Sequence, residues 1–317
     1  MAEPVTGEAI TTTGLGRAFG DRHAVRDLHL QVPTGQVMGL LGPNGAGKTT
    51  TIRMLTTLLA PTSGSARVAG LDVRRYPARA RGHIGYVPQE KGVRHLLTGR
   101  ESAEIEADLH HIPRRDRDRR VTEVLDLLGL LPDADRLVSE YSGGLQRRLD
   151  LACGLLHRPD VLILDEPTLG LDVPSRRQVW EHVRQLRDGG GTVLLATNYL
   201  DEADALCDRV TILDRGREVV TGTPAELKRK VGADVVVVRT RQPDRLGRAL
   251  TGLPWVRQVK VVDADVSVFV GDAPSALAAI MAAARRHDVA VLRATYERPT
   301  LDDVFVHFTG HAAAGVP

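Results

Sequence analysis

Apolar residues along the first 230 positions fall into short runs separated by turn residues. Fully apolar runs bounded by turns are typical of strands in a buried parallel sheet, and apolar spacings of three and four residues are typical of helices. The runs predict strands at residues 37–41, 66–70, 84–87, 161–164 and 192–197. The spacings predict helices at residues 50–59 and 149–156, and the highly charged segment at 100–131 is also expected to be helical. Partly alternating segments at residues 10–19 and 24–32 predict edge strands ahead of this core.

The pattern of short strands continues toward the C-terminus, but in a different arrangement. Residues 209–222 predict two strands around a tight Asp-Arg-Gly turn, and residues 223–227 predict the start of a short helix. A second, smaller unit is expected from residue 234 to about 310. Its predicted elements are strands at 235–239, 256–263, 266–270 and 289–294 and an alanine-rich helix at 273–286. The chain therefore predicts an α/β core followed by a small α+β module without a catalytic group of residues.

Composition narrows the class of protein. With 317 residues, 42% of them hydrophobic, the chain can form one large domain and a smaller one. The net charge of +2 gives no reason to expect nucleic-acid binding. The arginine-rich segment at 114–120 interleaves acidic residues and lacks aromatic ones, so it is interpreted as a solvated helix face.

The expected compartment follows from the cysteines and from hydropathy. Cys153 and Cys207 lie far apart without metal-binding spacing, which favours free, buried thiols in a reducing compartment. No apolar run approaches the ~20 residues of a membrane span, and residues 1–13 lack a signal-peptide pattern. We therefore expect a cytosolic chain that reaches a membrane only through a partner. The tail at 311–317 is expected to be disordered.

One motif predicts nucleotide binding. After the strand at 37–41 the chain fits the pattern G-x-x-x-x-G-K-[ST] and then enters the helix at 50–59. Glycines let successive backbone N–H groups turn toward phosphate oxygens, and the helix N-terminus adds positive potential. The lysine would reach the outer phosphates and the first threonine hydroxyl would complete a Mg²⁺ shell. The expected phosphate-binding residues are Gly42, Pro43, Asn44, Gly45, Ala46, Gly47, Lys48, Thr49 and Thr50.

Further candidates lie at the ends of predicted strands. Asp165 and Glu166 follow a fully apolar strand, where Asp165 is suited to holding Mg²⁺ and Glu166 to orienting or deprotonating a water. Gln89 follows residues 84–87 and could offer its amide oxygen to the metal or the water, although surface glutamines are common. Phe19 could stack on an adenine ring, or it could be an ordinary core or turn aromatic.

A second glycine turn opens the helix at 149–156. Ser142, Gly143 and Gly144 offer free N–H groups and a hydroxyl, which is a second phosphate-binding geometry. Two anion sites in one chain call for an explanation.

The ordered set of motifs resembles the nucleotide-binding subunit of an ATP-binding cassette (ABC) transporter. The motifs are GPNGAGKTT, the VPQ loop, YSGGL, LILDEP and the Leu169-Gly170-Leu171-Asp172 loop. The resemblance covers about residues 8–230 and implies a P-loop NTPase cassette with an antiparallel β edge subdomain and a helical subdomain at about 95–150. Residues 234–310 would form an accessory domain, whose ending at 298–305 resembles that of drug-exporting members of the daunorubicin-resistance type.

The resemblance also implies partners. In the family, the P-loop of one subunit, which corresponds to residues 42–49 here, and the signature turn of another, which corresponds to Ser142, Gly143 and Gly144, enclose each ATP. This arrangement would explain the second anion site. Asp172 matches the loop that communicates between the two ATP sites. We expect a dimer of this chain, although a heterodimer stays open, and a separate membrane permease contacted near Gln89 and the helical subdomain. The chain would lie on the cytoplasmic face of the cell membrane and support drug export. The accessory domain would assist assembly or only pack on the cassette.

Two positions depart from the family pattern. Leu145 replaces the usual glutamine of the signature, with little loss expected because the serine and glycines make the phosphate contacts. Asn198 replaces the histidine that contacts the γ-phosphate, and an amide carries no positive charge, so hydrolysis should slow more than binding. Three alternatives stay open: a different partner that supplies the competent site, a binding-only regulatory subunit, and a soluble cassette ATPase acting on nucleic acid or ribosomes.

Overall fold

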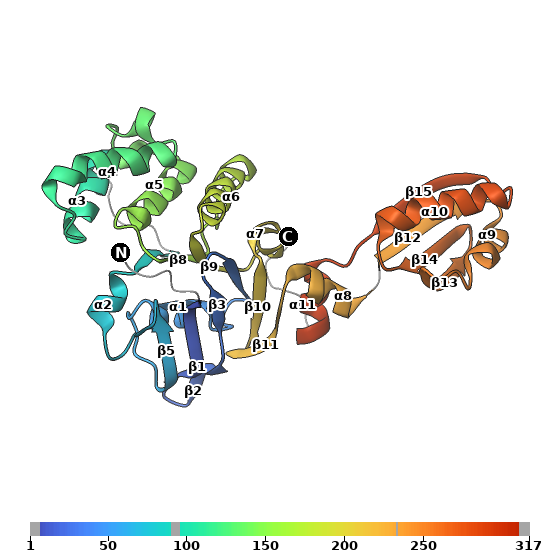
Figure 1. Ribbon diagram of the computed structural model, residues 1–317, viewed down its shortest axis with the longest axis horizontal. Coiled ribbons are helices and arrows are strands. Elements are labelled where there is room, and N and C mark those ends of the chain that lie inside the picture. Colours follow the sequence, from blue (N-terminus) through green and yellow to red (C-terminus); the bar gives the residue numbers. More distant parts are fainter. Residues whose placement is uncertain (1–6, 90–95, 233, 311–317) are drawn as a thin grey trace. The chain divides into compact units, whose positions relative to one another are not determined.

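The computed structural model describes residues 7–89, 96–232 and 234–310, and these form two compact units (Figure 1). The first unit ends at Pro224 and the second begins at Ala225. The tail expected to be disordered, and residue 95 at the expected start of the helical subdomain, lie outside the described residues.

A six-stranded sheet forms the centre of the first unit. Its strand order is β11-β10-β4-β9-β8-β7, and all neighbouring pairs are parallel except β10 with β11. The strands are β4 (Val37–Leu41), β7 (Ile84–Val87), β8 (Val161–Asp165), β9 (Thr192–Thr197), β10 (Arg209–Asp214) and β11 (Arg217–Gly222). Every residue of β4, β8 and β9 is buried, as their apolar runs predicted. The carboxyl ends of β4, β9, β8 and β7 therefore lie next to one another at one edge.

Helices accompany this sheet and form a separate subdomain. The helices of this part are α1 (Lys48–Leu55), α2 (Pro77–Arg81), α6 (Val173–Asp188) and α7 (Leu200–Leu206). The helical subdomain contains α3 (Gly99–Leu109), α4 (Arg114–Leu127), α5 (Gly143–Leu155) and short 3-10 turns at Leu131–Asp133 and Val138–Glu140. The segment expected to be helical at 100–131 is divided into two helices, α3 and α4. His111 adopts a left-handed backbone with φ 56°, and Pro113 cannot continue a helix from the preceding turn.

A second sheet of the first unit is antiparallel. It contains β1 (Glu8–Phe19), β2 (Arg22–Leu28), β3 (Gln31–Pro33), β5 (Ser63–Val68) and β6 (Leu71–Asp72). The single strand expected at 24–32 is two strands. Asp27, with φ 51°, bends the chain, so β2 pairs with the end of β1 and β3 pairs with its start. Buried residues of this sheet, including Leu15 and Val25, share one hydrophobic core with Ile52 of α1.

The second unit is an α+β module of the split β-α-β type. Its elements are α8 (Pro224–Val231), β12 (Asp234–Thr240), α9 (Pro243–Leu250), β13 (Val256–Val262), β14 (Asp265–Val270), α10 (Ala273–Arg286), β15 (Val291–Glu297) and α11 (Leu301–Thr309). The four strands pair antiparallel in the order β13-β14-β12-β15. Alternate valines of β12 and β14 form a core with Leu246 of α9 and Ile280 of α10. The pattern had missed α9 and had placed β15 two residues early.

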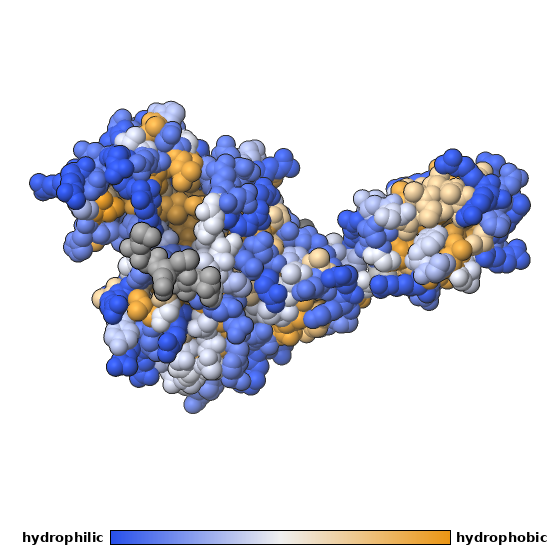
Figure 2. All heavy atoms as spheres, viewed as in Figure 1, coloured by the Kyte–Doolittle hydropathy of each residue, from blue (hydrophilic) through white to orange (hydrophobic). Residues whose placement is uncertain are grey.

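Polar residues cover most of the visible surface of each unit, and hydrophobic residues gather near α5 of the helical subdomain (Figure 2). Among the described residues, no helix is long and apolar enough to cross a membrane.

Candidate functional site

The turn between β4 and α1 requires glycine at two positions. A Cβ atom added to Gly42 would lie 2.4 Å from the carbonyl oxygen of Leu213, and one added to Gly47 would lie 2.6 Å from that of Ala24. Gly47 is the N-cap of α1 with φ 105°, and no side chain caps the helix there. The amides at the start of α1 are therefore available to an anion, as at other uncapped helix N-termini.

Lys48 lies at the centre of the site. It is 4% exposed, and its ammonium donates to the carbonyls of Gly42 at 2.7 Å and Pro43 at 3.3 Å. It also donates to Oδ1 of Asn198 and lies 3.6 Å from Oε1 of Glu166. Burial lowers the pKa of Lys48, and the nearby carboxylates oppose that shift. The lysine therefore links the P-loop to the ends of β8 and β9.

Asp165 has the environment of a cation ligand. It ends β8, its Oδ1 accepts a hydrogen bond from the Thr49 hydroxyl at 3.3 Å, and its Oδ2 is buried without a hydrogen-bond partner among the described residues. Burial raises the pKa of Asp165 above its ordinary value. A carboxylate oxygen and a hydroxyl are the hard donors that Mg²⁺ prefers, so these residues fit that ion. The described residues contain no cluster of three or more His, Cys, Asp or Glu side chains suited to a metal.

Glu166 lies between two polar side chains. Its Oε2 accepts a hydrogen bond from Nε2 of Gln89 at 3.1 Å, while Oε1 faces Lys48. The residue is 7% exposed and has φ 48°, a left-handed conformation that is costly for a residue other than glycine. Its own N–H donates to the carbonyl of Ala196 at 2.8 Å, which fixes it to β9.

Asn198 follows β9 and bonds to the P-loop at two points. Its Oδ1 accepts from Lys48, and its Nδ2 donates to Oδ1 of Asn44 at 2.9 Å. The amide thus uses both of its polar atoms, one as an acceptor and one as a donor.

A pocket of about 580 Å³ is lined by Lys48 and Glu166 but not by Asp165 or Asn198. It brings together most of the predicted phosphate-binding turn, Gln89 and Glu166, and it is lined by Phe19, Arg22, Ala24, Asn44, Gly45, Gly47, Lys48, Thr49, Thr50, Gln89 and Glu166. Phe19 is the last residue of β1 and 50% exposed, so it is not a core residue, and the guanidinium of Arg17 lies 4.6 Å from its ring centroid. Sequence reasoning had missed Arg22, which no motif marks and which pairs with Phe19 across β1 and β2.

The second glycine turn lies outside this pocket. Ser142 caps α5 by accepting a hydrogen bond from the amide of Leu145 at 3.2 Å, and its side chain is exposed. Gly144 is buried against α6, because an added Cβ would lie 2.5 Å from Oγ of Ser175. Ser142, Gly143 and Gly144 do not line the pocket around Lys48. One chain therefore does not bring the two candidate anion sites together.

Sequence reasoning also missed a buried cation beside the site. Arg147 of α5 is 4% exposed and donates to the carbonyls of Pro88, Asp165 and Pro167. It stands in a run of polar residues after the signature turn, where nothing in the sequence separates it from a surface charge.

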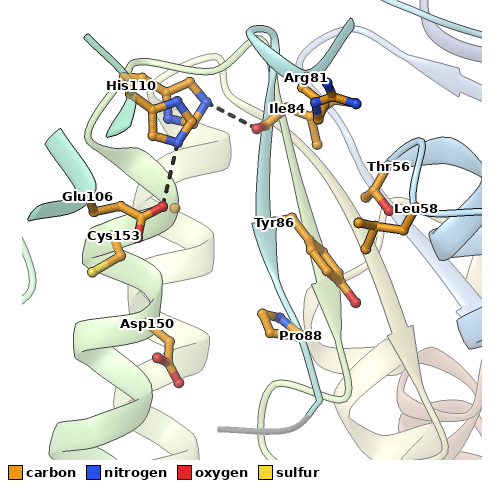
Figure 3. A pocket seen from close by; sticks show the side chains of 12 residues that line it. Thr56, Leu58, Arg81, Ile84, Tyr86, Pro88, Glu106, His110, Asp150 and Cys153 are labelled. Atoms are coloured by element: carbon orange, nitrogen blue, oxygen red, sulfur yellow. Dashed lines mark hydrogen bonds and ion pairs between the residues drawn. The ribbon is translucent and has the colours of Figure 1, made fainter. Parts of the chain in front are cut away.

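A second cavity, of about 270 Å³, lies between α5, α3, β7 and the segment after α1 (Figure 3). Leu58 and Tyr86 face Glu106 and Asp150 across it (Figure 3). The rings of His110 and His157 stack 3.7 Å apart in it, and Nε2 of His157 lies 3.0 Å from the carbonyl of Ile84. Burial lowers the pKa of His157 to about 4, so this imidazole is neutral near pH 7. Cys153 also lines the cavity, and both cysteines are free and buried, as predicted.

Comparison with known proteins agrees with this arrangement. The family model described as ABC transporter matches residues 25–169, and that of the ATP-binding protein DrrA1-3-like C-terminal domain matches residues 222–309. The chain is 43% identical to the daunorubicin resistance ATP-binding protein DrrA3 of Streptomyces coeruleorubidus, over 95% of this chain and 96% of that protein. It is 32% identical to the linearmycin resistance ATP-binding protein LnrL of Bacillus subtilis, over 93% and 96% of the two chains.

The fold is similar to those of solved ATP-binding cassettes. The structure of cbiO1 from Clostridium perfringens, described as part of the ABC transporter complex cbiONQ, is 26% identical with a TM-score of 0.65. The match covers 71% of this chain and 94% of that one.

Proposed function

Since the chain belongs to the ATP-binding subunits of ABC transporters, we propose that the pocket around Lys48 is the ATP site of this protein. The family assignment follows from 43% identity to one member over 95% of this chain. The predicted α/β ABC cassette is confirmed, and the chain is an ATPase that works with a membrane permease component. The observation that carries the assignment of the site is the strand order. The ends of β4, β9, β8 and β7 bring Lys48, Asn198, Glu166 and Gln89 into hydrogen-bonding or ion-pair contact.

ATP binding is assigned to the P-loop side. The amides of the turn and of the first turn of α1 hold the phosphates, Lys48 neutralises the outer ones, and Phe19 stacks on the adenine ring. The proposed contacts to the nucleotide are Phe19, Gly42, Pro43, Asn44, Gly45, Ala46, Gly47, Lys48, Thr49, Thr50, Gln89 and Asp165 within one chain, and Ser142, Gly143 and Gly144 from another.

We propose Mg²⁺ as the accompanying ion, held by Thr49, Asp165 and Gln89. The buried Oδ2 of Asp165, which has no partner among the described residues, supports this choice. When bound with ATP, the ion would neutralise charge that develops on the transferred phosphoryl group.

Hydrolysis is assigned to Glu166. Its carboxylate orients the attacking water and accepts its proton, while the hydrogen bond from Gln89 fixes the direction of the carboxylate. The amide of Asn198 can donate only a neutral hydrogen bond to the γ-phosphate, so the chain lacks the charge that a histidine could carry at this position. Binding should therefore be nearly intact and turnover modest.

The partners and cargo are also proposals. A second copy of the chain would contribute its exposed signature turn to each ATP, and the permease would contact the region of Gln89 and the helical subdomain. Residues 8–230 would be the ATP-binding domain and 234–310 the accessory domain. The relatives named for daunorubicin and linearmycin resistance support export of a drug or antibiotic-like compound from the cytoplasmic face of the cell membrane.

The test is the ATPase rate of the purified full chain with and without Glu166→Gln. The glutamine keeps the size and one hydrogen-bond acceptor but cannot take a proton, so turnover should fall about 100-fold or more while ATP binding persists. Equal rates at background would assign the chain to the binding-only regulatory class, and equal rates above background would refute the role of Glu166.

A further inference from the structure

Arg147 is a buried charge that the proposed mechanism does not use. The Nε atom of its guanidinium donates to the carbonyl of Pro167 at 2.7 Å, and Nη2 donates to the carbonyl of Asp165 at 3.0 Å. Nη1 donates to the carbonyl of Pro88 at 2.7 Å and lies 3.8 Å from Oδ2 of Asp150. Three backbone carbonyls, one at the end of β8 and two in the segments that follow β7 and β8, therefore converge on one side chain of α5.

The positions of these carbonyls are specific. Asp165 and Pro167 are the residues on either side of Glu166, and Pro88 directly precedes Gln89. The two side chains that bond to each other at 3.1 Å are thus both attached to backbone that Arg147 holds. Glu166 needs such support, because its left-handed φ of 48° is strained.

The same contacts join the site to the signature turn. Arg147 lies on α5, the helix whose N-cap is the exposed Ser142. Ser142 itself does not line the pocket around Lys48. A displacement of α5 would therefore act on the backbone beside Glu166 and Gln89 through this guanidinium.

We propose that Arg147 is a positioning residue for ATP hydrolysis, which holds Glu166 and Gln89 in their relative places and ties both to the helix of the signature turn. The inference rests on the proposed function, since it assigns to Arg147 the placement of residues that are themselves proposed to act in ATP hydrolysis. A planar guanidinium offers five N–H groups in fixed directions and satisfies three carbonyls at once. A lysine ammonium is a compact charge on a flexible stem and cannot reproduce that fork.

The test compares Arg147→Met and Arg147→Lys with wild type in the full chain. The matched control is Arg148→Met, because Arg148 is the next residue of α5 and donates to the carbonyls of Leu128 and Gly129, away from Glu166. Arg147→Met should lower kcat about tenfold or more with KM for ATP within about threefold, because the P-loop contacts are untouched. Arg147→Lys should recover only part of kcat, and Arg148→Met should stay within about twofold of wild type.

A second test, in the Glu166→Gln variant, separates a positioning role of Arg147 from a general structural defect. In Glu166→Gln the positioned carboxylate is absent, so adding Arg147→Met should lower the residual rate by less than about twofold. The same fold-loss in both backgrounds would overturn the inference, because a purely structural defect acts equally on each. Melting temperatures identify folded variants, and should Arg147→Met not fold, a folded Arg147→Lys with wild-type kcat also overturns it.

The outcomes distinguish this inference from the proposed function. A wild-type chain that binds but never hydrolyses ATP refutes the function. A wild-type chain that hydrolyses ATP, alongside folded Arg147 variants with unchanged kcat, refutes only the role of Arg147.

Discussion

The P-loop and the signature turn are both glycine turns that open a helix, yet their surroundings differ. At the P-loop, Lys48 is 4% exposed and reaches side chains at the ends of two other strands. At the signature turn, Ser142 is exposed and its hydroxyl caps its own helix. Both turns contain glycine, but the pocket that holds the first also contains Gln89 and Glu166 from elsewhere in the chain, whereas Ser142, Gly143 and Gly144 do not line it.

This difference has an energetic consequence. An exposed helix N-terminus contributes only about 0.3–1 kcal/mol to holding an anion, because water and salt screen it. A pocket that adds a buried ammonium and directed amides holds phosphate far more strongly. We therefore expect one chain to bind ATP through its P-loop alone, and the signature turn to act only when a second copy presents it.

The largest expected effect comes from blocking the exposed turn. Ser142→Arg places a long cation where the second copy's ATP should approach, without touching the pocket around Lys48. Turnover should fall about 100-fold, as when a donor to a transition state is removed, while the Kd for ATP of the single chain stays within about twofold. The measurements are the ATPase rate and titration with a fluorescent ATP analogue.

Ser139→Arg is the matched control for this change. Ser139 lies three residues upstream in the same subdomain and is also exposed, but it is not part of the turn. Its rate should equal that of wild type. If both arginine variants keep full turnover, the signature turn has no part in hydrolysis and the difference between the two turns is only one of exposure.

The P-loop side could be predicted from the sequence because its signals are local. A strand, a fixed glycine pattern and a helix start follow one another within 20 residues. Asp165 and Glu166 directly follow an apolar run, which places them at the end of a strand. The apolar runs do not reveal which strands are neighbours. The order β4-β9-β8-β7 depends on long-range packing, which the apolar runs do not record.

The sequence did not predict the buried position of Arg147 or the chain breaks at Asp27 and His111, for physical reasons. Arg147 is buried because carbonyls from two distant loops converge on it, which no local pattern records. The breaks at Asp27 and His111 depend on left-handed backbone at residues other than glycine, where composition gives a weak signal. Such positions are decided by the packing of the surrounding elements and not by propensity.

A smaller effect, of opposite sign, is expected on the P-loop side. Asn198→His introduces a ring that can be protonated beside the γ-phosphate, and charge-assisted hydrogen bonds are stronger than neutral ones. Turnover in the complex with the permease should rise roughly three- to tenfold, with little change in ATP affinity. Asn198→Gln is the control, because it keeps an uncharged amide and should not raise the rate. An unchanged or lower rate for the histidine variant would remove the explanation of modest turnover.

The smallest expected effect tests whether the pocket also recognises the base. Phe19 lines the pocket, and the guanidinium of Arg17 lies 4.6 Å from its ring centroid. Because the side chain is half exposed, aromatic surface is available for adenine. Phe19→Ala should weaken ATP binding by about 1 kcal/mol, or roughly fivefold in Kd. The variant should bind inorganic triphosphate, which has no base, as tightly as wild type does. Tyr76→Ala is the matched control, since Tyr76 is also exposed with an arginine 5.3 Å from its ring centroid but does not line the pocket. Equal affinities for the two variants would confine nucleotide recognition to the phosphates, and the contrast with the signature turn would then concern anion binding alone.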